Sequence, residues 1–318
     1  MTLPVVQPDG TRPGPGRATT AEAMAASPGV SNATDVSSVS DVSGPFRRRP
    51  TLAISPWTLL LWLSSAFVLA FLLLPILAIV PLSLSSGSLL VYPLPGLSLR
   101  WYAEVFTSPT WMRALGNSLG IGVAATAASV VLGTAAALGL QRSRTAWAAA
   151  LKAVLIAPMI VPVILIAVGS YFFLAPLGLS GNYTGLVIVH TVIALPFVVI
   201  PVLTALDTAD PNLQRAAAAC GASPTRTFFE VTLPGMRGAI ASGALFAFAA
   251  SFDDVVIALL LAGAGQRTLP QEMFSGLRES ITPAMLAVAT VMIAFSTALF
   301  LGLQAVQRRL RTSGKTGG

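Results

Sequence analysis

The chain has 318 residues, of which 54% are hydrophobic and only 10% are charged. Soluble domains carry about 25% charged residues, so this composition, with a mean hydropathy of +0.78, excludes an ordinary soluble fold and predicts an all-α membrane protein. The net charge of +7 does not indicate nucleic-acid binding, because the basic residues lie at the ends of apolar runs and form no aromatic-studded basic face.

Residues 1–50 differ from the rest of the chain. They are rich in Pro, Gly, Ser, Thr and Ala and contain almost no large apolar residues, so they cannot bury a core. We predict that they form a disordered cytoplasmic tail, or that they reflect a start site placed too early. They do not resemble a cleavable signal peptide, because no apolar segment occurs until after Arg47-Arg48-Arg49.

Six apolar segments are long enough to cross a bilayer, which takes about 20 apolar residues per helix. They lie at 57–82, 115–140, 147–174, 184–206, 239–261 and 283–306. We therefore expect a first helix with its outer loop (51–112), a core of five helices (113–306) and a cytoplasmic C-terminal tail (307–318). Pro158 and Pro162 interrupt the third segment and Pro196 and Pro201 the fourth, which predicts kinks that either set the packing or line a pathway.

The Lys and Arg residues predict the orientation, because they are enriched on the cytoplasmic side of membrane proteins. With the N-terminus inside, the cytoplasmic set is Arg47, Arg48, Arg49, Arg142, Arg144, Arg215, Arg226, Arg237, Arg308, Arg309, Arg311 and Lys315. The outer set is smaller and consists of Arg100, Arg113, Arg267 and Arg278. Both termini and the segment between the fourth and fifth spans are therefore predicted to be cytoplasmic.

That cytoplasmic segment contains two helix-start signatures. Asp210-Pro211 and Ser223-Pro224 each place an N-capping side chain before a proline at the first helical position. Gly221, between them, fits the left-handed residue that ends many helices. We predict two short helices, the second at about 225–232 and ended by Leu233-Pro234, which meet at a rigid elbow around Gly221.

The same segment resembles the EAA loop of type I ABC importer permeases, whose pattern is E-A-A-x3-G-x9-I-x-L-P. The corresponding residues here are Arg215, Ala216, Ala217, Gly221, Val231, Leu233 and Pro234, so Arg replaces the first Glu. Asn117-Ser118-Leu119 matches the family's entry to the permease core. The resemblance implies the type I permease fold, in which the loop at 207–237 docks into a dimer of ATPase subunits. ATP and Mg²⁺ then belong to that partner, and this chain needs no cofactor.

Ser251-Phe252-Asp253-Asp254 lies inside the predicted fifth span. One Asp near a span centre costs about 2.5–3.5 kcal/mol on insertion scales, so an intramembrane acid is a functional candidate. Adjacent helix positions point about 100° apart, so both carboxylates cannot face one pore. We expect one to meet substrate while the other caps or pairs with a neighbouring helix. The alternative is a packing or gating role for both.

The stretch from Ser251 to Thr290, with 266–270 and Met273-Phe274, resembles the second permease of spermidine/putrescine-type importers, as does His190 with 195–197. This resemblance implies a polyamine substrate, a different second permease subunit, an extracytoplasmic solute-binding protein and a lipid-embedded chain in a bacterial inner membrane. Carboxylates and aromatic faces suit a flexible polycation. The candidate residues of the substrate path are Asp253, Asp254, Ser251, Phe252, Tyr171 and His190.

Two other functional classes compete with this interpretation. A stand-alone secondary transporter or channel often shows internal repeats with paired broken helices, and no repeat is clear here. An intramembrane hydrolase would need a Ser–His or facing Asp pair, but Asp253 and Asp254 are consecutive and His190 has no evident serine partner. The sequence has no GxxxxGK phosphate loop. With one histidine and one cysteine (Cys220), we predict no metal site, no catalytic residue and no enzyme.

Overall fold

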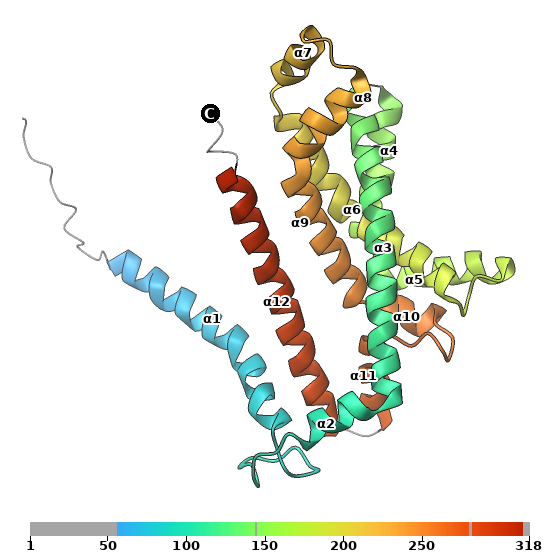
Figure 1. Cartoon of the computed structure of the whole chain (residues 1–318). Coiled ribbons are helices and arrows are strands. Elements are labelled where there is room, and N and C mark those ends of the chain that lie inside the picture. The colour runs from blue at the N-terminus through green and yellow to red at the C-terminus, as the bar shows by residue number, and fades with distance from the viewer. Residues whose placement is uncertain (1–55, 144, 280–281, 314–318) are drawn as a thin grey trace, which may run out of the picture. The chain divides into compact units, whose positions relative to one another are not determined.

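The computed structural model describes residues 56–143, 145–279 and 282–313, whose regular elements are helices. The predicted disordered tail at 1–50 lies outside these ranges. The chain forms two units, 1–60 and 61–318, and the features below belong to the second. The helices are α1 (Pro56–Ser83), α2 (Arg100–Thr107), α3 (Pro109–Arg142), α4 (Ala146–Ile156), α5 (Val163–Leu174), α6 (Tyr183–Thr208), α7 (Pro211–Ala219), α8 (Pro224–Thr227), α9 (Leu233–Phe252), α10 (Val256–Leu261), α11 (Leu269–Glu279) and α12 (Pro283–Ser313) (Figure 1).

Five helices of the described residues are long and apolar enough to span a membrane. They cover Pro56–Ser83, Pro109–Arg142, Tyr183–Thr208, Pro224–Phe252 and Pro283–Gly302, at or next to five of the six predicted segments. The predicted third segment forms a sixth span only if a bent helix pair counts as one. α12 continues to Ser313, so the expected C-terminal tail begins as helix.

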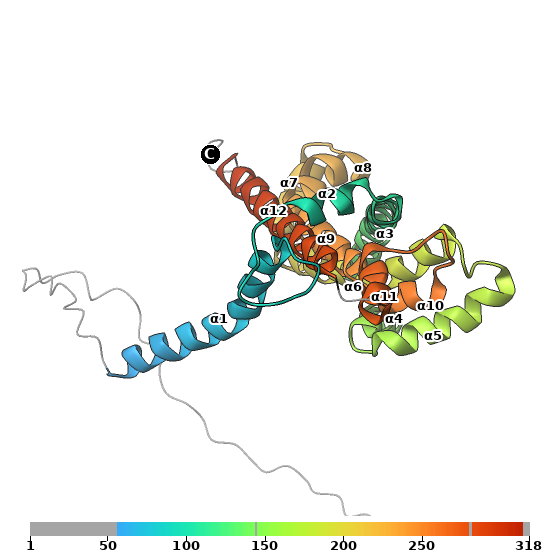
Figure 2. The same cartoon turned by 90° about the horizontal axis from the view of Figure 1, so that it is seen from below.

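The third segment breaks at its prolines. Its halves, Ala146–Met159 and Val163–Leu177, are bent by 106°, and α5 extends away from the other helices (Figures 1 and 2). Pro158 and Pro162 flank the break, where each removes a backbone donor and restricts the residue before it. The fourth segment behaves differently, because α6 runs without interruption through Pro196 and Pro201.

The core lies where α3, α6 and α9 pack side by side (Figure 1). Val198, Val199 and Val202 of α6 are fully buried there. Gly243 of α9 faces α6 so closely that an added Cβ would lie 3.0 Å from the Cα of Val198. Small residues at such contacts let helix backbones approach in lipid, where dispersion contacts replace the hydrophobic effect.

The predicted fifth span is wrong beyond Phe252. We expected one helix through 239–261, but α9 ends at Phe252 and α10 begins only at Val256. The Oδ2 of Asp254 accepts a hydrogen bond of 2.8 Å from the Ile257 N–H in the first turn of α10. Short acidic side chains compete for backbone donors in this way, so they favour helix ends over helix interiors.

Candidate functional site: an elbow before α9 and an acidic, aromatic cavity

The first arm of the elbow is α7, and local sequence sets both of its ends. The Asp210 carboxylate accepts a hydrogen bond from the Asn212 N–H at 2.9 Å. At the other end, Gly221 has φ +81°. Its N–H donates to Ala218 O at 2.9 Å, and the Ala222 N–H donates to Ala217 O at 3.0 Å. These two bonds form a Schellman motif, which ends the helix and turns the chain.

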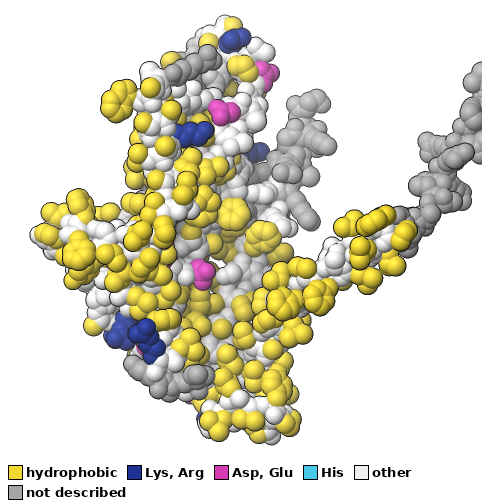
Figure 3. Space-filling view, turned by 180° about the vertical axis from the view of Figure 1, so that it is seen from behind, with side chains coloured by type: hydrophobic (Ala, Val, Ile, Leu, Met, Phe, Trp, Pro, Cys, Tyr) yellow, Lys and Arg dark blue, Asp and Glu magenta, His cyan; other side chains and the backbone are white. Residues whose placement is uncertain are grey.

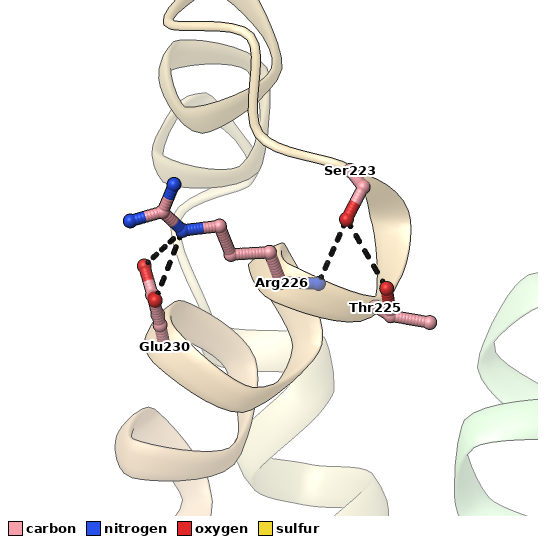
Figure 4. A network of polar contacts seen from close by, with 4 residues as sticks. All are labelled: Ser223, Thr225, Arg226 and Glu230. Atoms are coloured by element: carbon pink, nitrogen blue, oxygen red, sulfur yellow. Dashed lines mark hydrogen bonds and ion pairs between the residues drawn. The ribbon is translucent and has the colours of Figure 1, made fainter.

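The second arm begins as predicted and then departs from the prediction. Ser223 caps α8 by accepting from the Arg226 N–H at 3.3 Å, and the Arg226 Nε lies 3.0 Å from Glu230 Oε1 (Figure 4). The expected end at Leu233-Pro234 is wrong, because α8 continues through a π-helical turn (Phe228–Thr232) into α9. The Leu233 N–H donates to Phe228 O, and such a wide turn is one way in which a helix accommodates a proline.

This correction changes what the elbow can do. Its second arm and the fifth span form one helix, Pro224–Phe252, of 29 residues. At 1.5 Å per residue this helix is about 43 Å long. The elbow lies at one end of it and the Asp253-Asp254 break directly follows the other. One helix therefore joins the elbow to the acidic pair.

The residues of the EAA-like pattern divide into two groups. Arg215, Ala216 and Gly221 are exposed on the elbow, and Ala217 is half-buried. Arg215 makes a long hydrogen bond of 3.4 Å from its Nη1 to Asn212 Oδ1. Two others attach the elbow to the bundle, because Val231 lines a hollow beside α6 and Leu233 packs against the α3–α6–α9 core. Pro234 is exposed in the first turn of α9.

A cavity of about 530 Å³ lies where α9 ends. Asp253 and Asp254 line it from the break, and the other lining residues are mostly aromatic or aliphatic. They are Phe197, Leu245, Phe246, Phe248, Ala249, Ala250, Phe252, Phe295, Ser296, Leu299 and Phe300. The ring of Phe252 stacks on Phe248 with centroids 5.4 Å apart and lies 5.2 Å from Phe295. The cavity therefore joins carboxylates to apolar and aromatic faces.

The two carboxylates have different roles in the structure. Asp254 is committed to the α10 backbone through its bond to Ile257. Asp253 is exposed on the cavity, and its backbone N–H ends α9 by donating to Ala249 O at 3.0 Å. The sequence predicted that one acid would cap or pair, and Asp254 is that cap; contact of Asp253 with a substrate stays a prediction.

The structure gives His190 a serine partner, so the expectation that it had none is wrong. Its Nδ1 lies 2.9 Å from the Ser251 Oγ, and both side chains are buried. Neither residue lines the cavity, and the Nε2 of His190 is buried without a hydrogen-bond partner among the described residues. A nucleophilic serine needs access to a substrate. This pair therefore acts as a buried polar link between α6 and α9 and gives no support to a hydrolase.

Removing this link is expected to destabilise the bundle. Ser251→Ala leaves the buried Nδ1 of His190 unpaired, which costs about 1–3 kcal/mol, and should lower the apparent Tm of the purified protein. Ser242→Ala is the matched control on the same helix, because among the described residues the Ser242 hydroxyl bonds its own helix at Ala239 O. Equal Tm values for the two variants would show that the His190–Ser251 contact contributes nothing to stability.

The remaining path candidate and the residues missed from sequence complete the site. Tyr171 lies on α5, with its ring 5.8 Å from that of Phe172, and it is not among the residues that line the cavity. Phe252, a predicted path residue, lines the cavity. The rest of the aromatic wall was missed, although Phe248 lies four residues before Phe252 and so shares its helix face. Phe295, Ser296 and Phe300 come from α12 and gave no local signal.

Comparisons with known proteins agree with this architecture. A family profile described as "Binding-protein-dependent transport system inner membrane component" matches residues 129–312. The chain is 32% identical over 246 residues to the putrescine transport system permease protein PotI of Escherichia coli K12, covering 75% of this chain and 86% of that one. It is 30% identical over 214 residues to the spermidine/putrescine permease PotC of Haemophilus influenzae, covering 67% and 83%.

A solved structure of similar fold supports the same conclusion about architecture. A chain of a bacterial alginate ABC transporter, in complex with an alginate-bound periplasmic protein, superposes with a TM-score of 0.60. It covers 80% of this chain and 95% of its own length at 16% identity. At that identity the likeness establishes the fold and says nothing of the substrate.

Proposed function

The chain belongs to the family of binding-protein-dependent transport system inner membrane components, and from this premise we propose that it forms the translocation path for a polyamine. As a member of that family it is the permease subunit of an ATP-binding-cassette importer and a multi-pass inner-membrane protein, and it is not itself an enzyme. Because the chain belongs to this family, the alternative of a stand-alone secondary transporter or channel is no longer needed to explain the apolar helices.

The cavity at the end of α9 is the observation that carries the polyamine assignment. A polyamine presents ammonium groups separated by methylene segments. The Asp253 carboxylate matches an ammonium group, and the rings of Phe248, Phe252 and Phe295 offer apolar and cation–π contacts to the rest of the molecule. PotI and PotC are permeases for putrescine and spermidine/putrescine, which agrees with this chemistry. An anionic solute would be repelled by the same carboxylates.

The exposed rim of the cavity supports assembly with a second permease. Phe246 and Phe300 line the cavity and are 49% and 47% exposed, so a partner packed against them would cover this part of its rim. We propose a heterodimer in which the partner permease closes the cavity. Both termini and the elbow then face the cytoplasm, where a dimer of ATPase subunits binds ATP and Mg²⁺. The outer end faces a solute-binding protein.

Coupling in this proposal runs along the helix Pro224–Phe252. The ATPase dimer grips Arg215, Ala216 and the turn at Gly221, and its closure rotates α8 and α9 as one body. The rotation displaces Asp253 at the far end of the helix and so alternates the access of the cavity to the two sides. This chain requires no cofactor of its own for that motion.

The test is ATP hydrolysis by the complex reconstituted in lipid vesicles. Mild detergent extraction should bring down an ATPase subunit with this chain. Putrescine-loaded solute-binding protein should stimulate the ATPase several-fold, whereas binding protein loaded with an oxyanion should not. A purified monomer that carried putrescine without ATP would contradict the proposal.

A further inference from the structure

Asn117 of α3 binds the loop between α10 and α11 through its side chain and is 8% exposed. Its Nδ2 donates to Gly265 O at 3.0 Å and to Arg267 O at 2.9 Å. The hydroxyl of Tyr183, at the start of α6, donates to Asn117 Oδ1 at 2.9 Å. The Asn117 amide therefore uses both of its N–H groups and its carbonyl, a combination that a neutral amide side chain offers. We call Asn117 and Tyr183 the amide clamp, and neither residue lines the cavity.

Further contacts fix the same loop. The Leu269 N–H donates to Ser118 Oγ at 2.7 Å. The Gly181 N–H, in the turn before α6, donates to Leu261 O at 2.9 Å. Gly263 approaches that turn so closely that an added Cβ would lie 3.0 Å from Gly181 O. The C-terminal end of α10 is therefore attached both to α3 and to the turn before α6.

α10 is a short link between this loop and the acidic pair. It has six residues and is about 9 Å long at 1.5 Å per residue. Ile257 and Leu261 are almost completely buried in a cluster with residues of α5 and α6. The Ile257 N–H donates to Asp254 Oδ2 at 2.8 Å. A shift of α10 would therefore carry Asp254 with it, and Asp253 is the adjacent residue.

The position of Asp253 depends on the two helices that meet at the break. Residues 253–255 lie between the end of α9 and the start of α10. On the α9 side, the Asp253 N–H donates to Ala249 O at 3.0 Å, and on the α10 side Asp254 makes the connection. An acidic side chain lies among hydrophobic ones in the middle of the face shown in Figure 3. Reactive and binding contacts depend steeply on geometry, because a displacement of about 1 Å can cost about a hundredfold in rate.

We propose that Asn117 is a positioning residue for polyamine binding, and that it acts on Asp253 through the loop and α10. The inference rests on the proposed function and deepens it, because it names a residue outside the cavity that controls the cavity's carboxylate. Loss of the amide clamp releases the loop, so that α10 and its Asp254 cap shift and Asp253 no longer meets the ammonium group. A hydrogen bond that only stabilised the bundle would lower stability without acting through Asp253.

The experiment is a double-mutant cycle on ATP-driven uptake of labelled putrescine by the full complex in proteoliposomes. Asn117→Ala should lower uptake about tenfold when Asp253 is present. In the Asp253→Asn background the same change should lower uptake less than about twofold, because two residues that act through one contact have non-additive effects. The binding protein and the lipid are the same for all variants, so their contributions cancel in the comparison.

Ser129→Ala is the matched control on the same helix. The Ser129 hydroxyl is buried and donates to Thr191 O of α6 at 3.2 Å, but it lies 12 residues from Asn117, or about 18 Å along α3. Ser129→Ala should lower the apparent Tm by a similar amount, and any loss of uptake should be the same factor in both backgrounds. If Asn117→Ala does not assemble, Tyr183→Phe removes only a hydroxyl and should show a smaller, equally non-additive fall of about threefold.

The contradicting outcomes separate this inference from the proposed function. An equal factor of loss in both Asp253 backgrounds would show that Asn117 acts only on stability. Unchanged uptake in an assembled Asn117→Ala complex would also overturn the positioning role, and both results would leave the proposed function intact. Unchanged uptake in Asp253→Asn itself would overturn the polyamine cavity, and this inference with it.

Discussion

Asp253→Asn should remove most putrescine uptake, whereas Asp254→Asn should keep most of it. The Asp253 carboxylate lines the cavity and is exposed, so its loss removes a charged contact to an ammonium group. Such contacts contribute about 1.5–3 kcal/mol, which corresponds to a fall of about ten- to a hundredfold. Asp254→Asn retains an amide oxygen that can accept the bond from the Ile257 N–H. The measurement is ATP-driven uptake of labelled putrescine into proteoliposomes.

Assembly and unstimulated ATPase activity are the controls for this comparison. Asp254→Ala removes the acceptor altogether and should cost about 1 kcal/mol of stability, as lost helix caps do, so it separates capping from ligand binding. Equal uptake by wild type and Asp253→Asn, with the complex intact, would remove the physical basis of the polyamine assignment. Equal losses in the two Asn variants would show that both acids act in gating or packing.

The elbow could be predicted from sequence because its determinants are local. Asp210 and Ser223 cap the helices that follow them, and Gly221 takes the left-handed conformation that the pattern required. The end of the second arm could not be predicted in the same way. Pro234 normally signals a break, but a π-helical turn before it lets the chain continue into α9. Whether a proline ends a helix or is absorbed depends on the packing around it.

Only part of the cavity could be predicted from the sequence. The acidic pair was recognisable because charge in a span is costly. The capping role of Asp254 arises from the break between α9 and α10, which the prediction of one continuous helix did not include. Its aromatic partners come from α6, α9 and α12, and only tertiary packing brings them together. His190 and Ser251 are 61 residues apart. The break after Phe252 was missed because the apolar pattern continues through α10 and hides it.

Gly221→Val should uncouple ATP hydrolysis from transport or prevent assembly with the ATPase. Gly221 has φ +81°, a conformation that is a rare outlier for a β-branched residue and costs about 1–3 kcal/mol. No heavy atom lies within 4 Å of an added Cβ, so the penalty falls on the backbone and is relieved by reshaping the elbow. Uptake should fall at least about tenfold relative to ATP hydrolysis measured in the same vesicles.

The chain offers a matched control for the backbone effect. Gly178 has φ +67° and also has no heavy atom within 4 Å of an added Cβ, but it lies between α5 and α6, outside the elbow. Gly178→Val should therefore carry a similar strain and preserve coupling, and Gly221→Asn should restore coupling because Asn tolerates the left-handed region. Normal coupling in Gly221→Val would argue against transmission of the ATPase motion through the elbow. Arg215 and Ala216 would then bind the ATPase without transmitting its motion, because rotation of α9 and Asp253 requires an elbow of fixed shape.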